Sequence, residues 1–330
     1  MKSYVIDICC GLGGISLAAK QLGMNPLLGV DICENAMKTY EANFPEANIL
    51  NLDITRKHSS DKIQKYLHDN GVKSKSLYVV SGPPCQGFSA AGKRQADDPR
   101  NNIIVRVASL ISKIKPNAAI VENVSSIGHK RYDKTIHRFK KILADSDYYV
   151  CDIELNALDF GVPQRRYRKI FFVTRCDISE NDYLSYINKK RSIAPVIKRA
   201  FAGLPEAKVR PDDYHDGLSY KGFFNHFAMQ HSEKVKRKIA GIEPGAGPFS
   251  YRKLDPNNYA PTLISGHRAP PVHYNEHRSI TAREAARIQS FPDSFRICGD
   301  FGSQLQQIAN AVPPKLASVV LKTLLHFTEQ

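Results

Sequence analysis

The apolar residues of the chain form short runs that alternate with longer amphipathic stretches, as is typical of an α/β protein. Residues 4–8, 77–80, 118–121 and 170–173 are apolar runs of strand length, rich in β-branched or aromatic side chains. Residues 103–114, between the second and third of these runs, carry apolar side chains at helical spacing. We therefore predict an open α/β sheet whose strands are separated by helices.

The first strand leads into a glycine turn formed by Gly11, Gly13 and Gly14, and a helical pattern follows it. Asp31 ends the next strand, 20 residues beyond Gly11, where a βαβ unit places a carboxylate for ribose hydroxyls. Asp53 ends a predicted third strand and can accept a hydrogen bond from an adenine amino group. The third glycine of a dinucleotide motif is missing, which favours a phosphate-free adenosine ligand over NAD.

Two prolines follow the strand at 77–80 and stiffen the turn that carries Cys85. The carboxyl ends of strands are where chemistry is found in open α/β sheets. Glu122 follows the neighbouring strand, and a carboxyl group beside an apolar strand is partly desolvated and tends to stay protonated. A packed cysteine and a strand-end acid are the simpler alternatives, but together the two residues indicate a nucleophile and an acid. The polar loop 90–100 is predicted to be a lid over this pair, or else a solvated connection.

Arg166 and Arg168 lie on one face of an extended segment that leads into the strand at 170–173. We expect both guanidinium groups to point together into the site. A solvated basic cluster is the alternative.

Composition changes near residue 183. Residues 183–277 carry 15 basic and 8 acidic residues with weak periodicity, and the whole chain of 330 residues has a net charge of +15. This indicates a second, smaller, irregular domain and a polyanionic partner. A capping-box-like helix start at 279–284 and a closing helix after 307 return to regular structure.

Cysteine and histidine spacing predicts no metal site, and the seven cysteines, an odd number, fit free thiols in a reducing cytoplasm. No stretch approaches the roughly 20 consecutive apolar residues of a membrane span, so no membrane association is expected.

Taken together, these segments resemble the DNA (cytosine-5)-methyltransferase family, in the family's order and over nearly the whole chain. The Pro-Cys-Gln, Glu-Asn-Val and Gln-x-Arg-x-Arg elements are specific in combination. The matching segments are 7–16, 29–31, Asp53, 82–89, 122–124, 164–168, 283–292 and 307–313.

The resemblance implies a Rossmann-like S-adenosylmethionine-dependent catalytic domain (1–182), a target-recognition domain (183–277) and a C-terminal segment (278–330) that returns to the first domain. The implied catalytic residues are Cys85, Glu122, Arg166 and Arg168. The implied cofactor-binding residues are Asp7, Gly11, Gly13, Gly14, Asp31, Ile32, Asp53, Ile54, Pro83, Asn310 and Ala311. The implied DNA contacts are Gln86, Ser89, Gln164 and Thr262.

The chemistry explains these residue types. A Cys85 thiolate that adds to C6 of cytosine makes C5 nucleophilic, and Glu122 can donate a proton to N3. The arginines can hold O2 of the base. The cytosine of a duplex must be flipped out to reach such a pocket.

Two residues depart from the family pattern. Cys9 stands where an aromatic residue usually stacks on adenine, and Ala309 replaces the usual glycine before Asn310.

The resemblance predicts a monomeric enzyme of the prokaryotic cytoplasm that acts on double-stranded DNA, with or without a separate cognate restriction endonuclease. A tRNA cytosine-5 methyltransferase of the same architecture is the nearest alternative, although its Cys-Phe-Thr element is missing from the sequence. A catalytically inert DNA-binding relative is the other alternative. A nicotinamide dehydrogenase is disfavoured by the glycine spacing.

Overall fold

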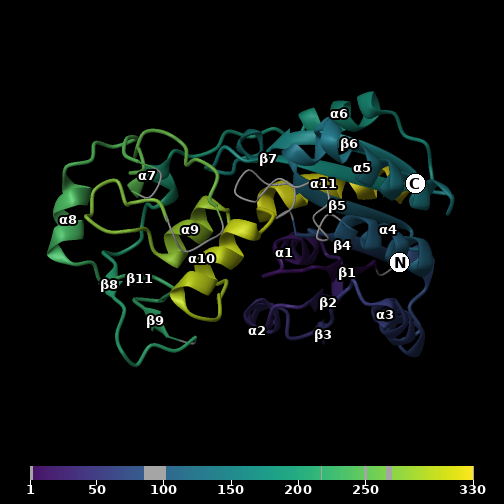
Figure 1. Cartoon of the computed structure of the whole chain (residues 1–330), viewed down its shortest axis with the longest axis horizontal. Helices are drawn as coiled ribbons and strands as arrows, with labels where there is room; N and C mark the ends of the chain where they lie inside the picture. The colour runs from purple at the N-terminus through teal and green to yellow at the C-terminus, as the bar shows by residue number, and fades with distance from the viewer. Residues whose placement is uncertain (1–2, 85–101, 217, 249–250, 265–269, 330) are drawn as a thin grey trace. The chain divides into compact units, whose positions relative to one another are not determined.

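A computed structural model describes residues 3–84, 102–216, 218–248, 251–264 and 270–329 (Figure 1). The chain forms two compact units. The first comprises residues 1–156, 167–191 and 316–330, and the second comprises 157–166 and 192–315.

The first unit is built on a seven-stranded sheet with the order β3-β2-β1-β4-β5-β7-β6. Neighbouring strands from β3 to β5 are parallel, and β7 is antiparallel to both β5 and β6. The strands are β1 (Tyr4–Ile8), β2 (Asn25–Asp31), β3 (Asn48–Asn51), β4 (Leu77–Ser81), β5 (Ala118–Val124), β6 (Tyr149–Asn156) and β7 (Tyr167–Thr174). Because β1, β2, β4 and β5 are in parallel register, their carboxyl ends meet at one sheet edge.

Helices connect these strands and cover both faces of the sheet. They are α1 (Gly14–Gln21), α2 (Glu34–Asn43), α3 (Lys57–Asp69), α4 (Asn102–Ile114), α5 (Asp133–Ala144) and α6 (Glu180–Asn188). The helix α11 (Pro314–Thr328) begins in the second unit and continues into the first.

Successive residues of β7 show why both faces need helices, because side chains alternate along a strand. Phe171 packs edge-on against Phe139 of α5, with ring centroids 5.2 Å apart. Phe172 stacks on Tyr183 of α6 at 4.4 Å, and Tyr183 in turn contacts Phe327 of α11. The strand is therefore buried on both sides, which explains its continuous apolar run.

The second unit contains shorter elements. Its helices are α7 (Ile197–Ala200), α8 (Glu233–Ala240), α9 (Ala282–Ile288) and α10 (Phe301–Asn310), and its strands are β8 (Lys208–Val209), β9 (Ser219–Tyr220), β10 (Phe223–Phe224) and β11 (Phe227–Ala228). Thr281 caps α9, and the Glu284 side chain bonds back to the Thr281 N–H, so the capping box forms.

The α/β fold class is confirmed, while several local predictions need correction. The strand β3 ends at Asn51, so Asp53 lies in the turn beyond it. The helix α10 has no counterpart among the predicted elements. The first unit extends to residue 191, the second unit takes up 157–166, and residues 278–315 belong to the second unit. These are the bounds of compact units, which do not by themselves divide catalysis from recognition. The functional boundaries at 182 and 277 stay predictions.

One helical stretch, Phe301–Thr328, has the length and apolar composition of a membrane span. Its most apolar window is 67% buried within the protein, and Pro313 and Pro314 divide it into α10 and α11. A buried, interrupted helix of this kind belongs to a protein core and is weak evidence for a membrane span.

Candidate active site

The glycine turn after β1 is held by the carboxylate of Asp31 at the end of β2. Gly11 N–H donates to Asp31 Oδ2 at 2.8 Å, and Cys33 N–H donates to Oδ1 at 2.9 Å. Gly11 has a φ of 52°, and a Cβ added there would meet nothing within 4 Å. The turn thus presents open space, and each Asp31 oxygen keeps a further lone pair for a ligand hydroxyl.

Gly13 of this turn and Gly29 of β2 are required by packing. A Cβ on Gly13 would lie 2.5 Å from the Phe44 ring, and one on Gly29 would lie 2.8 Å from the Tyr40 ring. These glycines are therefore needed for the close packing of α2 against the sheet as well as for a ligand turn.

Asp7 is buried below the turn, where Ser16 Oγ donates to its Oδ2 at 2.7 Å. Ser16 Oγ also lies 2.9 Å from the Tyr40 hydroxyl. Burial, and to a lesser extent the charge of Asp31, raises the pKa of Asp7 to about 7, although the Ser16 hydrogen bond opposes the shift. Asp7 supports the turn from inside the protein. Sequence reasoning had missed its partner Ser16.

The turn after β3 is ordered by Asp53, whose Oδ1 accepts from Thr55 N–H and Thr55 Oγ1 at 2.9 and 2.6 Å. These hydrogen bonds lower the pKa of Asp53. Ile32 follows the end of the neighbouring strand β2 and is 64% exposed. An exposed apolar residue, an open glycine turn, the strand-end carboxylate of Asp31 and the turn carboxylate of Asp53 fit an adenosine-type ligand. Cys9, at the usual aromatic position, has a φ of 57° and is half-buried.

The turn that leads to Cys85 is anchored to the sheet. Ser81 Oγ donates to Ile8 O at 2.7 Å, and Asn123 Nδ2 donates to Pro83 O at 3.2 Å. Asn123 Oδ1 accepts from Val124 N–H, which fixes the side chain. Cys85, Gln86, Ser89 and the predicted lid at 90–100 lie outside the described residues.

Glu122 of β5 is buried and faces Arg168 of β7. Nε of Arg168 lies 2.8 Å from Oε1 of Glu122, which is ion-pair distance, although Oε1 receives no well-directed hydrogen bond from the described residues. Arg168 Nη1 also donates to Tyr167 O. The antiparallel β5–β7 pairing brings the two residues together, because it sets Arg168 opposite Val124. Spacing along the chain could not have revealed this.

Arg166 has different partners from Arg168. The residue is 1% exposed, and Nη2 donates to Ala309 O and Ala311 O at 2.9 and 2.8 Å, at the C-terminal end of α10. A guanidinium group at a helix C-terminus satisfies carbonyls that the helix leaves unbonded. The expectation that Arg166 and Arg168 point together therefore needs correction. Asn310 is exposed within the second unit, and its cofactor role stays a prediction, as does that of Ala311.

Gln164 is fully buried in the second unit. Its Oε1 accepts from Leu263 N–H and its Nε2 donates to Gln289 Oε1, both at 3.2 Å. Thr262 Oγ1 donates to Arg165 O at 2.6 Å. Gln164 thus secures residues 262–263 from inside the protein, and direct DNA contact by its side chain would require it to move.

His273, Glu276 and Glu284 bring three ligand atoms within 4.8 Å, as in a small metal site. Arg278 occupies this cluster, however. Its guanidinium donates to both carboxylates, at 2.6–3.1 Å to Glu276 and 2.7–2.8 Å to Glu284. Burial lowers the pKa of His273, so the cluster is an ion-pair network around a neutral histidine.

The model of the family described as C-5 cytosine-specific DNA methylase matches residues 3–326. The chain belongs to this family. It is a Rossmann-like DNA (cytosine-5)-methyltransferase, as the order of its motifs predicts.

Individual relatives agree with this assignment. The chain is 32% identical to the Type II methyltransferase M1.HphI of Haemophilus parahaemolyticus, over 98% of this chain and 87% of the relative. It is 30% identical to the Type II methyltransferase M.DdeI of Desulfomicrobium norvegicum, over 98% and 89%.

Solved structures share the fold. A prophage-encoded protein of E. coli, described as a DNA modification methyltransferase, superposes with a TM-score of 0.83 at 26% identity, over 100% of both chains. The S. pombe Dnmt2 methyltransferase superposes with a TM-score of 0.69 at 16% identity, over 100% of both chains, which shows the common fold alone.

Proposed function

We propose that the protein binds S-adenosylmethionine and methylates C5 of a cytosine flipped out of a specific duplex sequence. The observation that carries the proposal is the sheet edge along which Asp31, the turn with Asp53, the Pro83 turn and Glu122 lie. This edge offers an adenosine-type cradle on one side and an acid paired with Arg168 on the other.

The bound cofactor would supply an electrophilic methyl group. The Cys85 thiolate forms a bond to C6 of cytosine, and the electron pair of the C5–C6 double bond becomes available at C5. Glu122 delivers a proton to N3, which neutralises the charge that develops on the ring. Transfer of the methyl group to C5 would leave S-adenosylhomocysteine as the by-product. A base then removes the C5 proton, its electron pair re-forms the C5–C6 double bond as the Cys85 thiolate leaves C6, and N3 returns its proton to the Glu122 carboxylate.

Of the two arginines, we assign Arg168 to contact with the reacting base. Its ion pair with Glu122 orients the carboxyl group, and its remaining donors can reach O2. Arg166 instead supports the chain around Ala309 and Ala311.

Asp31 would hold the ribose hydroxyls and Asp53 would lie near the adenine amine. Titration calorimetry with S-adenosylhomocysteine tests this arrangement. We expect Asp31→Ala to weaken binding about tenfold or more, because two charge-assisted hydrogen bonds are lost. Unchanged affinity would place the ligand elsewhere.

Residues 183–277 are proposed to choose the target sequence, with Gln86, Ser89 and Thr262 near the extruded base. The enzyme is proposed to act as a monomer in the prokaryotic cytoplasm, within a restriction-modification system or as a stand-alone methylase. Bisulfite sequencing of DNA from cells that express the protein tests the activity. A methylated cytosine in one recurring sequence supports the proposal, whereas unmodified DNA alongside a modified tRNA would replace it with the tRNA alternative.

A further inference from the structure

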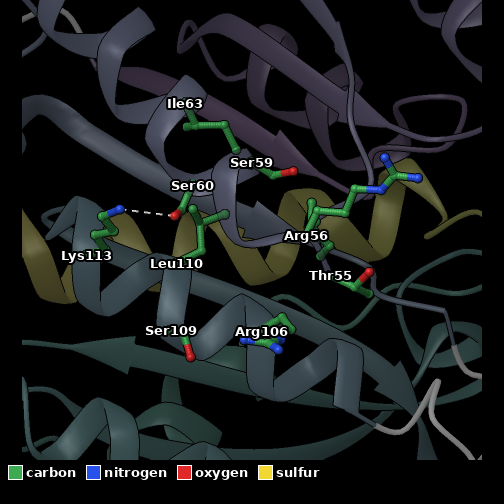
Figure 2. A pocket seen from close by; sticks show the side chains of 10 residues that line it. Thr55, Arg56, Ser59, Ser60, Ile63, Arg106, Ser109, Leu110 and Lys113 are labelled. Carbon is green, nitrogen blue, oxygen red and sulfur yellow. Dashed lines mark hydrogen bonds between the residues drawn. The ribbon is translucent and has the colours of Figure 1, made fainter.

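A cavity of about 130 Å³ lies between α3 and α4 in the first unit (Figure 2). The turn that follows Asp53 forms its third wall, through Ile54, Thr55 and Arg56. This volume is room for about four water molecules, or for a chain of roughly six heavy atoms.

The walls of the cavity combine apolar and cationic groups. Ile63 of α3 and Leu110 of α4 are buried and supply apolar surface. Arg56, Arg106 and Lys113 supply positive charge, and no carboxylate is among the lining residues that the structure describes. The cavity therefore suits a ligand group with a short carbon chain and a terminal negative charge.

The three cations are not equivalent. Lys113 pairs with Asp61 and donates to Ser60 Oγ at 3.1 Å, a bond that joins α4 to α3 in Figure 2. Arg56 lies 3.6 Å from Asp53. Arg106 is exposed and pairs with no carboxylate in the part of the chain that the structure describes, so it is the cation available to a ligand.

The cavity adjoins the predicted adenine edge. Two of its wall residues, Thr55 and Arg56, contact the Asp53 carboxylate directly, at 2.6 Å and 3.6 Å. Under the proposed function, Asp53 lies near the amino group at N6 of adenine. The turn formed by residues 53–56 thus borders both the predicted adenine edge and the cavity.

We propose that this cavity is a side pocket of the cofactor site, which accepts adenosyl ligands whose N6 carries a short acidic chain. The inference rests on the proposed S-adenosylmethionine site. Arg106 would pair with the terminal carboxylate, and Ile63 and Leu110 would pack against the methylene groups.

Titration calorimetry on the full chain tests the pocket with three probes. They are S-adenosylhomocysteine, its N6-(3-carboxypropyl) derivative, and the matching carboxamide. Ser109→Phe fills the cavity from an exposed position on α4, and Arg106→Ala removes the cation. Lys62→Phe and Lys62→Ala are the matched controls, because Lys62 is exposed on α3 and outside the cavity lining.

We expect wild-type protein to bind the acid about two- to fivefold more tightly than the carboxamide, as for a partly exposed ion pair. Arg106→Ala should abolish this preference, and Ser109→Phe should weaken both derivatives about tenfold or more through overpacking. The parent ligand should bind both variants within about twofold of wild type, and the Lys62 variants should match wild type with all three probes.

Two results would overturn the pocket. One is that both N6 derivatives fail to bind wild-type protein while the parent binds. The other is that the acid binds Ser109→Phe and Arg106→Ala as well as it binds wild type. Failure of the parent ligand itself on wild-type protein would instead refute the proposed cofactor site.

Discussion

At the residue scale, the structure separates groups that support the site from groups that can react in it. Asp7, Asn123 and Gln164 are buried, and their side chains bond to protein groups. Motif spacing marks all three positions but cannot distinguish support from ligand contact, because both demand a fixed polar residue. The decisive information is which atoms the fold brings within hydrogen-bonding distance.

Asp7 should make the protein less stable as pH rises. Its folded-state pKa of about 7 exceeds the ordinary value of 3.8, so the folded protein binds more protons than the unfolded chain between these pH values. The resulting loss of stability from about pH 4 to above pH 7 amounts to as much as about 4 kcal/mol. Asp7→Asn removes this loss. The free energy of unfolding of the variant, measured with urea, should therefore increase relative to that of wild type between pH 5 and pH 8. A stability difference that does not change with pH would contradict this.

Glu122→Gln keeps the shape of the side chain but cannot deliver a proton. We expect turnover to fall about 100-fold or more while duplex affinity stays within about threefold. Turnover of tritiated methyl groups and a gel-shift titration measure the two quantities. Equal losses in both would show that Glu122 positions DNA instead.

At the element scale, the strands β1, β4 and β5 and the amphipathic helix α4 follow directly from the sequence, because burial on one or both faces imposes their periodicity. The extent of β7 and the existence of α10 do not. Arg168 belongs to β7 because β5 pairs with it, and this long-range pairing leaves no local signal. Gln304 and Gln307 are buried on α10, and such buried polar residues obscure an apolar stripe.

Arg166 should matter for stability more than for chemistry. Arg166→Lys keeps the charge but cannot span Ala309 O and Ala311 O together, so we expect a loss of about 1–3 kcal/mol in the free energy of unfolding. Arg168→Lys is the matched variant and should lower turnover with a smaller change in stability. Urea unfolding measures the stability effect, and turnover per folded molecule measures the catalytic effect. The reverse pattern would indicate that Arg166, and not Arg168, contacts the reacting base.

At the scale of the whole molecule, the sequence predicts an α/β catalytic part and a basic, irregular part, and the structure contains two units. The compact units are divided differently from the predicted functional domains, because residues 157–166 and 278–315 pack within the second unit through pairs such as Gln164 with Gln289 and Arg278 with Glu276. The first contact joins residues 125 positions apart, and the second depends on side-chain conformation. Neither leaves a pattern in the local sequence from which the extent of the units could be predicted.

The choice of DNA target sequence should transfer with residues 192–252, which form most of the basic region 183–277. Exchanging residues 192–252 for the counterpart of a family member with a different target leaves Arg278 and both of its carboxylate partners in place. We expect the chimera to methylate the donor's sequence, because base edges are read by side chains on such short elements. An active chimera that still methylates the original sequence would assign recognition to another segment.

The central claim is that the protein methylates DNA cytosine through Cys85. Duplex DNA that carries 5-fluorocytosine at the target position tests it most directly. A base cannot remove the C5 fluorine as it removes a proton, so the bond between sulfur and C6 does not break and the adduct persists. In the presence of S-adenosylmethionine we expect a denaturation-resistant protein–DNA adduct with wild type and none with Cys85→Ala. An adduct that survives in Cys85→Ala, or one that forms on a fluorinated tRNA and never on the duplex, would contradict the account.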